Sequence, residues 1–351
     1  MKTKEQILNI LKKSYEDSRY VLFGEQCGTR AKPLDMIANY AEKSGGHKPA
    51  VLGIDLNCYG FQLPLIGENS PEWNEYLDHV TAFAEEGGIV TASSHYTNPF
   101  RKYGEGLDVC RGEFGGEELW EEMLTEGTEI NKKVKEELVL EGKFLGELGK
   151  RGVTVLWRPL HEANGGWFWF CARSHSNMPW INPEYLRRFW KYIYNLYVNE
   201  MGLTNLIWVY GPNVSGNNDK NPHGTRSVLF YYPGDEYVDM VGVDWYTGDG
   251  KDIGGHSYDL IMSTGKIAAL TEFGNSGNIR LGHDFTIEQQ SEVYSAVDAV
   301  NTIKNCIRKG YKISYVLTWS SIYGAFYRLG KAKEALDDPF CIDLERLNKL
   351  Y

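Results

Sequence analysis

The stretch "RPLHEANGGWFWF", Arg158 to Phe170, places a cation, an imidazole, a carboxylate and several large aromatic rings close together. A carboxylate among rings is costly to bury unless a partner satisfies it or its pKa is shifted, so Glu162 is a candidate proton donor. A second carboxylate, Glu272, stands in "LTEFG" (residues 270–274). Glycoside hydrolysis needs such a pair, because one carboxyl protonates the leaving oxygen while the other attacks or activates water.

Other chemistries find weaker support in the sequence. The stretch "HEANG" lacks the second histidine of H-E-x-x-H, and "GNSGN" (residues 274–278) ends in asparagine where G-x-S-x-G needs glycine. Asp244 and His95 could help to hold a divalent ion, but scattered Asp and His residues are more often structural. The six cysteines contain no C-x-x-C pair, which argues against structural zinc. We therefore predict no metal and no cofactor.

The elements that must position these residues recur along the chain. Short apolar runs rich in β-branched residues predict strands near 20–24, 50–56, 88–95, 153–159, 206–213, 238–246, 267–274 and 313–320. Helical periodicity separates them, as in Ile130, Val134 and Leu138, in Tyr185, Phe189, Ile193 and Leu196, and in Val293, Val297, Val300 and Ile307. Apolar strands that alternate with helices indicate a parallel sheet covered on both faces.

Eight such units in 351 residues predict an α/β fold of the (β/α)8 TIM barrel type, a single domain over residues 1–351 with long βα loops. The alternative is an open doubly wound sheet. That fold would need a glycine-rich phosphate loop after the first strand, which "FGEQCGTR" does not supply. The barrel is therefore favoured.

Polar and aromatic residues gather where the predicted strands end, which is where barrels of this kind carry their chemistry. They are Asp55, His95, Arg158, His161, Glu162, Asn213, Asp244, Tyr246, Glu272 and Trp319. Glu162 follows the fourth predicted strand and Glu272 ends the seventh. These strands face each other across the mouth of an eight-stranded barrel, so the two glutamates are expected to reach one bond from opposite sides.

Composition and charge limit the partners. The chain has 42% hydrophobic and 24% charged residues, and no run approaches the roughly 18 apolar residues of a membrane span. A formal net charge of -10 disfavours nucleic acid, whose binders concentrate Lys and Arg. Ten Trp and 23 Tyr offer ring faces that could stack on sugars, although ordinary packing accounts for most of them. We expect a monomer with no membrane or nucleic-acid partner.

At the candidate site the sequence resembles glycoside hydrolase family 26, a group of (β/α)8 retaining enzymes in which β-mannanases predominate. The resemblance runs through "WRPLHEANGGWFWF", "YYPGDEYVDMVGVDWY", "LTEFG" and the final "TWS", from about residue 20 onward. It implies that Glu162 is the general acid/base and Glu272 the nucleophile. The family's first strand usually ends in a sequence like "GHQ". Here "FGEQCGT" has Glu25 in place of the histidine, so no sugar-contact role is carried over to this loop.

The resemblance also implies roles for neighbouring residues. His161 would orient or electrostatically tune Glu162, Trp167 would pack against sugar near the cleavage point, and Tyr246 would hydrogen-bond the nucleophile. The positions similar to sugar-contacting or supporting residues of the family are His95, Arg158, Asp244 and Trp319. In the retaining mechanism Glu162 needs a raised pKa, which the aromatic residues around it would provide by excluding water.

The predicted function is that of a retaining endo-β-1,4-mannanase whose partner is a mannan, glucomannan or galactomannan polysaccharide or oligosaccharide. Two alternatives stay open. The same machinery could act on another β-glycan, since the family also includes β-1,3-xylanases and mixed-linkage glucanases, or the barrel could bind carbohydrate without catalysis. Because a polymer cannot enter a cell, we expect an extracellular enzyme whose leader is absent from the sequence, with a cytoplasmic enzyme that trims imported oligosaccharides as the alternative.

Two further features concern the loops. The long segments 96–120 and 214–235 are expected to shape the outer part of the site, and their aromatic residues include Tyr96, Phe100, Tyr103, Phe114, Tyr231 and Tyr232. Cys27 and Cys58 follow the first and second predicted strands and would lie on neighbouring loops. They form either a disulfide or two thiols.

Overall fold

The strands form a closed barrel. The computed structural model describes residues 1–27, 32–58, 61–104, 106–171, 181–214, 226–247, 253, 256–275, 286–319 and 326–351. Eight parallel strands pair with their neighbours in turn, and β10 pairs with β1, so the sheet closes. The strands are β1 (Val21–Gln26), β2 (Val51–Asp55), β5 (Ile89–Ser93), β6 (Val155–Arg158), β7 (Leu206–Tyr210), β8 (Met240–Thr247), β9 (Ile267–Asn275) and β10 (Tyr315–Thr318). Each overlaps one of the predicted runs, and the predicted barrel is confirmed.

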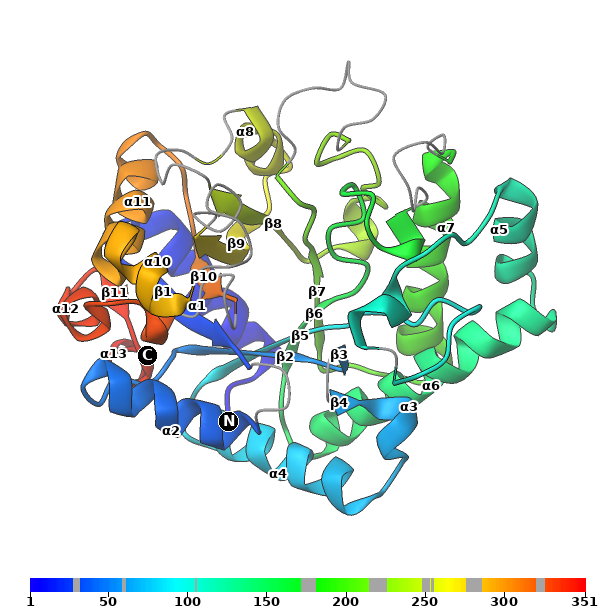
Figure 1. Ribbon diagram of the computed structural model, residues 1–351, viewed down its shortest axis with the longest axis horizontal. Coiled ribbons are helices and arrows are strands. Elements are labelled where there is room, and N and C mark those ends of the chain that lie inside the picture. The colour runs from blue at the N-terminus through cyan, green and yellow to red at the C-terminus, as the bar shows by residue number, and fades with distance from the viewer. Residues whose placement is uncertain are drawn as a thin grey trace.

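Helices follow the strands and surround the barrel (Figure 1). They are α1 (Lys4–Asp17), α2 (Pro33–Ser44), α3 (Leu63–Ile66), α4 (Pro71–Glu85), α5 (Glu117–Leu124), α6 (Glu129–Lys150), α7 (Pro183–Tyr194), α8 (His256–Ser263), α10 (Ile287–Val293), α11 (Ala296–Arg308), α12 (Ala332–Asp337) and α13 (Leu344–Leu350). The helical pattern predicted from Val293 to Ile307 is wrong as one helix. It breaks at Ser295, whose hydroxyl caps α11 by accepting from the Asp298 amide, and Val293 is exposed at the end of α10.

Short elements build the loops. The hairpin β3 (Asn57–Cys58) and β4 (Phe61–Gln62) follows β2. Elsewhere there are 3-10 helices η1 (Gly106–Cys110), η2 (Trp169–Cys171), η4 (Asp235–Tyr237) and η6 (Phe326–Arg328), and a π-helix η3 (Asn195–Glu200) extends α7. The strand β11 (Cys341–Ile342) pairs in parallel with the first residues of β1.

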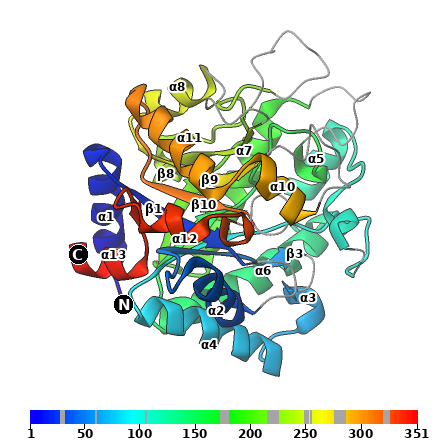
Figure 2. The same ribbon diagram turned by 60° about the vertical axis from the view of Figure 1, so that its left-hand side comes forward.

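One end of the barrel is sealed by apolar packing. Ile7, Ile10 and Leu11 of α1 belong to the same buried cluster as the inward-facing strand residues Leu22 and Leu156. Figure 2 shows α1 and α13 at one end of the barrel, with α3 and β3 at the opposite end. The candidate site therefore lies at the opposite end of the barrel, at the C-terminal ends of the strands. Among the described residues, no helix is both long and apolar enough to cross a membrane.

Strand geometry aims the charged residues at the open end. Side chains alternate along β6, so Arg158 points to the same side as the interior residue Leu156. Gly211 leaves room for the Arg158 side chain, because a Cβ at that position would lie 2.7 Å from Arg158 Cδ. The pairing of β8 with β9 shifts register after Val243, which sets Asp244 opposite Glu272. Such irregularities re-aim side chains, and here the shift brings two carboxylates together.

Candidate active site

Arg158 holds two carboxylates at the mouth of the barrel. Its Nη1 donates to Asp244 Oδ2 at 2.6 Å and its Nη2 donates to Glu272 Oε1 at 2.5 Å, and all three side chains are buried. The Tyr246 hydroxyl donates to Glu272 Oε2 at 2.6 Å, which is the hydrogen bond that the resemblance implied. Both oxygens of Glu272 thus accept from a donor, which fixes the carboxylate and stabilises its negative charge.

Glu162 lies in a strained turn after β6. Its φ of 53° is unusual for a residue with a side chain, and its amide donates to Gly211 O at 2.8 Å. The Trp167 indole Nε1 donates to Glu162 Oε2 at 2.8 Å, and Asn213 Nδ2 donates to Oε1 at 2.9 Å. Burial, followed by the charge of Glu272, raises the pKa of Glu162 to about 7, and the two donors only partly oppose this. Glu162 is therefore able to hold a proton near neutral pH.

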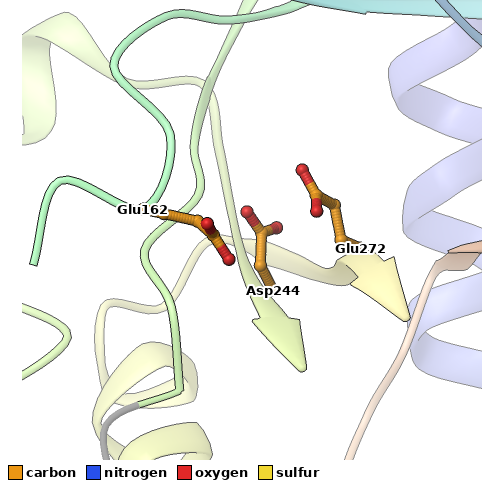
Figure 3. Close-up of side chains that lie close together, drawn as sticks. All are labelled: Glu162, Asp244 and Glu272. Carbon is orange, nitrogen blue, oxygen red and sulfur yellow. The ribbon is translucent and has the colours of Figure 1, made fainter. Parts of the chain in front are cut away.

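Three carboxyl groups lie close together in this cluster. One oxygen from each of Glu162, Asp244 and Glu272 lies within 4.8 Å of the others, and Figure 3 shows Asp244 between the two glutamates. Burial raises the pKa of Asp244 well above its usual range, against the effect of Arg158, and the Thr271 hydroxyl donates to Asp244 Oδ1 at 2.7 Å. The spacing alone could hold a divalent cation. However, the Arg158 guanidinium already pairs with two of the three, so the cluster fits a proton-sharing site better than a metal site.

Two imidazoles stand beside the carboxylates. His95 Nδ1 lies 2.8 Å from Asp55 Oδ2, which also accepts from the Ser93 hydroxyl at 2.7 Å. Burial lowers the pKa of His95, but the charge and hydrogen bond of Asp55 outweigh it and raise the pKa overall. Burial, with the charges of Arg158 and His95, lowers the pKa of His161 well below its usual range, so this ring is neutral. Among the described residues His161 has no hydrogen bond to Glu162.

Aromatic rings complete the site. The Phe168 ring centroid lies 5.1 Å from those of both His95 and His161. Trp319, partly exposed at the end of β10, has its ring centroid 6.2 Å from that of His95. The structure thus gathers every residue that was predicted for the site, namely His95, Arg158, His161, Glu162, Trp167, Asp244, Tyr246, Glu272 and Trp319.

Sequence reasoning missed two residues that position the acid. Asn164 Nδ2 donates to Asn213 O at 2.8 Å and to Arg226 O at 2.9 Å, while its Oδ1 accepts from the Asn213 amide at 2.8 Å. It therefore ties the loop that carries Glu162 to the loop after β7. At Gly165 a Cβ would lie 2.2 Å from the Trp167 ring, so only glycine leaves room for that ring. The available signal was their place inside "HEANGG", next to the candidate acid.

The first strand does not contribute to the site through Glu25. This buried carboxyl accepts from the Phe326 amide at 3.3 Å and bonds to the Thr318 hydroxyl. The neighbouring Cys27 is buried and is not in a disulfide, so the alternative of a bridge to Cys58 is wrong.

A closed (β/α)8 barrel with a protonatable glutamate near a second, ion-paired glutamate at its mouth is the arrangement of the barrel glycoside hydrolases. The model of "Glycosyl hydrolase family 26" matches residues 1–321. The chain belongs to this family, and the resemblance seen in the sequence is confirmed.

Relatives and solved structures agree with this assignment. The chain is 30% identical over 271 residues to "Mannan endo-1,4-beta-mannosidase A and B" of Caldalkalibacillus mannanilyticus, which covers 77% of this chain and 50% of that relative. The chain thus spans about half the length of this curated relative. A solved Bacillus subtilis mannanase matches with a TM-score of 0.74 at 26% identity, over 96% of this chain and 91% of that one. A shorter match of 96 residues, 41% identical, joins 27% of this chain to 10% of "Endoglucanase H" of Acetivibrio thermocellus.

Proposed function

We propose that the protein is a retaining endo-β-1,4-mannanase that cleaves mannan, glucomannan or galactomannan. The observation that carries the proposal is the pair of glutamates in different electrostatic surroundings. Glu162 has a pKa raised to about 7, whereas Glu272 is ion-paired to Arg158 and hydrogen-bonded to Tyr246. Carboxyl oxygens within 4.8 Å leave no room for a water between nucleophile and sugar, which favours retention over inversion.

The first step forms a covalent glycosyl-enzyme. Glu162 donates its proton to the glycosidic oxygen while the Glu272 carboxylate attacks the anomeric carbon, so the bond from that carbon to the leaving oxygen breaks. The proton on Glu162 is available near neutral pH because burial raises its pKa. Arg158 and Tyr246 keep Glu272 oriented for the attack.

The second step releases the sugar. Glu162, now ionised, takes a proton from water, and the resulting hydroxide attacks the same anomeric carbon and expels the Glu272 carboxylate. Two inversions give net retention of configuration. Trp167 acts in both steps, since its indole N–H stabilises the ionised form of Glu162 while its ring is free to pack against the sugar on the leaving-group side.

A mixed-linkage or other β-glucan is the second candidate substrate. The relative named "Endoglucanase H" favours it, although that match is confined to 96 residues. The catalytic pair would work in the same way on either polymer, and the two candidates differ in the sugar that the mouth accepts. Since both substrates are polymers, we propose that the enzyme acts outside the cell.

The test is reducing-sugar release from mannan, glucomannan, galactomannan, β-1,3-xylan and mixed-linkage β-glucan, with wild type beside Glu272→Ala. Release from the mannans, lost in the variant, would support the substrate and the nucleophile together. Release from glucan or xylan alone would agree with the proposed mechanism but would show that the proposed substrate is wrong. No release from any polymer or from short oligosaccharides would leave a binding protein as the better description. The anomeric configuration of the first product, followed by NMR, tests retention separately.

A further inference from the structure

Two of the aromatic residues predicted for the outer part of the site are exposed near the mouth. Tyr96, Phe114 and Tyr231 are buried, whereas Phe100 is 56% exposed and Tyr103 is 38% exposed. Beside them on α3 lies Leu65, which is 58% exposed. The other large hydrophobic side chains exposed among the described residues are Val293 of α10 and the terminal residues Met1, Leu350 and Tyr351. Three of these seven exposed side chains thus stand on the segments that follow β2 and β5.

Contacts between two segments bring the chain next to Tyr103 close to Leu65. The Gly104 amide, which follows Tyr103, donates to Gln62 Oε1 at 2.9 Å, and Gln62 directly precedes α3. A Cβ on Gly104 would lie 3.8 Å from Leu65 Cδ1, so the two loops are in van der Waals reach. We name the surface formed by Leu65, Phe100 and Tyr103 the outer platform.

The outer platform rests on a packed aromatic base. Phe100 has its ring centroid 6.0 Å from that of Phe114, which in turn lies 4.9 Å from Trp169 and 5.2 Å from Trp120. Trp169 and Trp120 are fully buried. Phe100 is therefore the solvent-facing end of a stack that continues into the core, rather than a side chain on an unsupported loop.

A buried carboxylate lies near the other ring. Glu137 of α6 is 5% exposed, and it accepts from Asn57 Nδ2 at 2.7 Å and from the Thr97 amide at 2.9 Å. A carboxylate is costly to bury, and these donors from two segments compensate it. Burial, followed by the charge of Glu137, raises the pKa of Tyr103. The hydroxyl of Tyr103 thus lies near this carboxylate while part of its ring remains in solvent.

The same carboxylate links the outer platform to the active site. Thr97 stands two residues after His95, and Asn57 stands two residues after Asp55, the partner of His95. From His95 to Tyr103 the chain could span at most about 28 Å, so the platform lies within a few sugar residues of the catalytic centre.

We propose that the outer platform is a distal sugar-binding surface, on which a β-linked hexose chain held in the active site stacks one of its sugars. The proposal rests on the proposed function. Flat ring faces and a neighbouring aliphatic side chain match the C–H face of a hexose ring. The formal net charge of -10 favours a neutral chain over a polyanion as the occupant. The partial burial of Tyr103 reduces the entropy lost on binding, because part of its ring is already held by the protein.

The experiment compares chain lengths. Values of kcat/KM are measured on mannotetraose and on mannohexaose for wild type, Phe100→Ala and Tyr103→Ala. We expect the hexaose-to-tetraose ratio to fall roughly threefold to tenfold in each variant, since one stacked ring is lost for the longer chain only. Tyr351→Ala is the matched control, because that tyrosine is also 38% exposed but lies at the sealed end, and its ratio should equal that of wild type.

Tyr103→Phe separates the ring from its hydroxyl. This variant keeps the stacking face and loses only the hydroxyl near Glu137, so its ratio should lie between those of wild type and Tyr103→Ala. Equal losses on both oligosaccharides in the alanine variants would overturn the proposal, because the residues would then act through the His95 loop. An unchanged ratio would also overturn it. If wild type prefers another β-glycan, the proposed substrate fails independently, and the same length series of that glycan tests the platform.

Discussion

At the residue scale, the cluster of Glu162, Asp244, Glu272 and Arg158 makes the two glutamates chemically unequal. Arg158 pairs directly with Glu272 and Asp244, but it leaves Glu162 to two neutral donors. Burial and the charge of Glu272 therefore raise the pKa of Glu162 to about 7. The difference between acid and nucleophile arises from their donors, because Glu272 accepts from the Arg158 guanidinium and the Tyr246 hydroxyl. Pairing with Arg158 is not sufficient by itself, since the more deeply buried Asp244 keeps a raised pKa beside it.

Replacing Glu162 should lower activity most on substrates with a poor leaving group. We expect Glu162→Gln to lower kcat/KM on mannan by about 10²–10⁴-fold, because the leaving oxygen is no longer protonated. On an aryl mannoside with a good leaving group the first step should be much less affected, so the glycosyl-enzyme should accumulate. Glu272→Gln is the comparison and should lose activity on both substrates. Equal losses of Glu162→Gln on the two substrates would contradict its role as the acid.

Trp167 should tune the alkaline limb of the pH profile. Activity requires protonated Glu162, so kcat/KM should fall as pH rises above about 7. The Trp167 hydrogen bond lowers the pKa of Glu162, hence Trp167→Phe should move the falling limb to higher pH. Trp169→Phe is the control, because its indole donates instead to Tyr96 O at 2.7 Å. A limb that stays in place or moves to lower pH in Trp167→Phe would disprove the assignment.

The sequence predicted which residues form the site better than how each one acts. The run "WFWF" was expected to shield Glu162 as a group, yet its members separate. Trp167 donates to the carboxylate, Phe168 packs on the histidines, and Trp169 and Phe170 belong to the core. Consecutive residues in an irregular loop have no fixed periodicity, so the sequence could not assign their directions. The bridging role of Asn164 was equally inaccessible, because it depends on a loop 49 residues away.

At the element scale, strand order was readable because each barrel strand is an apolar run bounded by polar residues. Structural details that depend on single contacts could not be predicted from the sequence. The break between α10 and α11 depends on the cap at Ser295, and the register shift between β8 and β9 leaves no signature in composition. That shift nevertheless sets Asp244 opposite Glu272. The smallest irregularity of the sheet is thus the one on which the chemistry depends.

Glu25 should act as a neutral tie between β1 and the chain after β10. Burial raises its pKa well above the usual range, and it contacts Thr318 and the Phe326 amide. We expect Glu25→Leu to lower the free energy of unfolding at pH 7 by about 1–3 kcal/mol, because both partners lose their bond. Glu25→Gln, which is also neutral, should lose less. Urea unfolding of both variants measures this, and a glutamine variant as unstable as the leucine variant would show that Glu25 is ionised.

At the scale of the whole molecule, acidic groups buried between α6 and the segments after β2 and β5 make stability depend on pH. Glu137 and Glu141 of α6 are both buried, and burial raises the pKa of Glu137 from 4.5 to about 7. Between these pH values the folded protein holds a proton that the unfolded chain has released. This contribution to stability is therefore complete below pH 4.5 and is lost as the pH rises through about 7.

Removing the titrating group should flatten that dependence. We expect the free energy of unfolding of wild type to fall between pH 5 and 7.5, with a share from Glu137 on the order of 3 kcal/mol, and Glu137→Gln to show a smaller slope. The slope is the decisive quantity, since the substitution also weakens the bonds from Asn57 and Thr97 and lowers stability at every pH. Glu118→Gln on the exposed face of α5 should keep the wild-type slope. An unchanged slope in Glu137→Gln would place the bound proton on its neighbour Glu141, for which Glu141→Gln is the corresponding test.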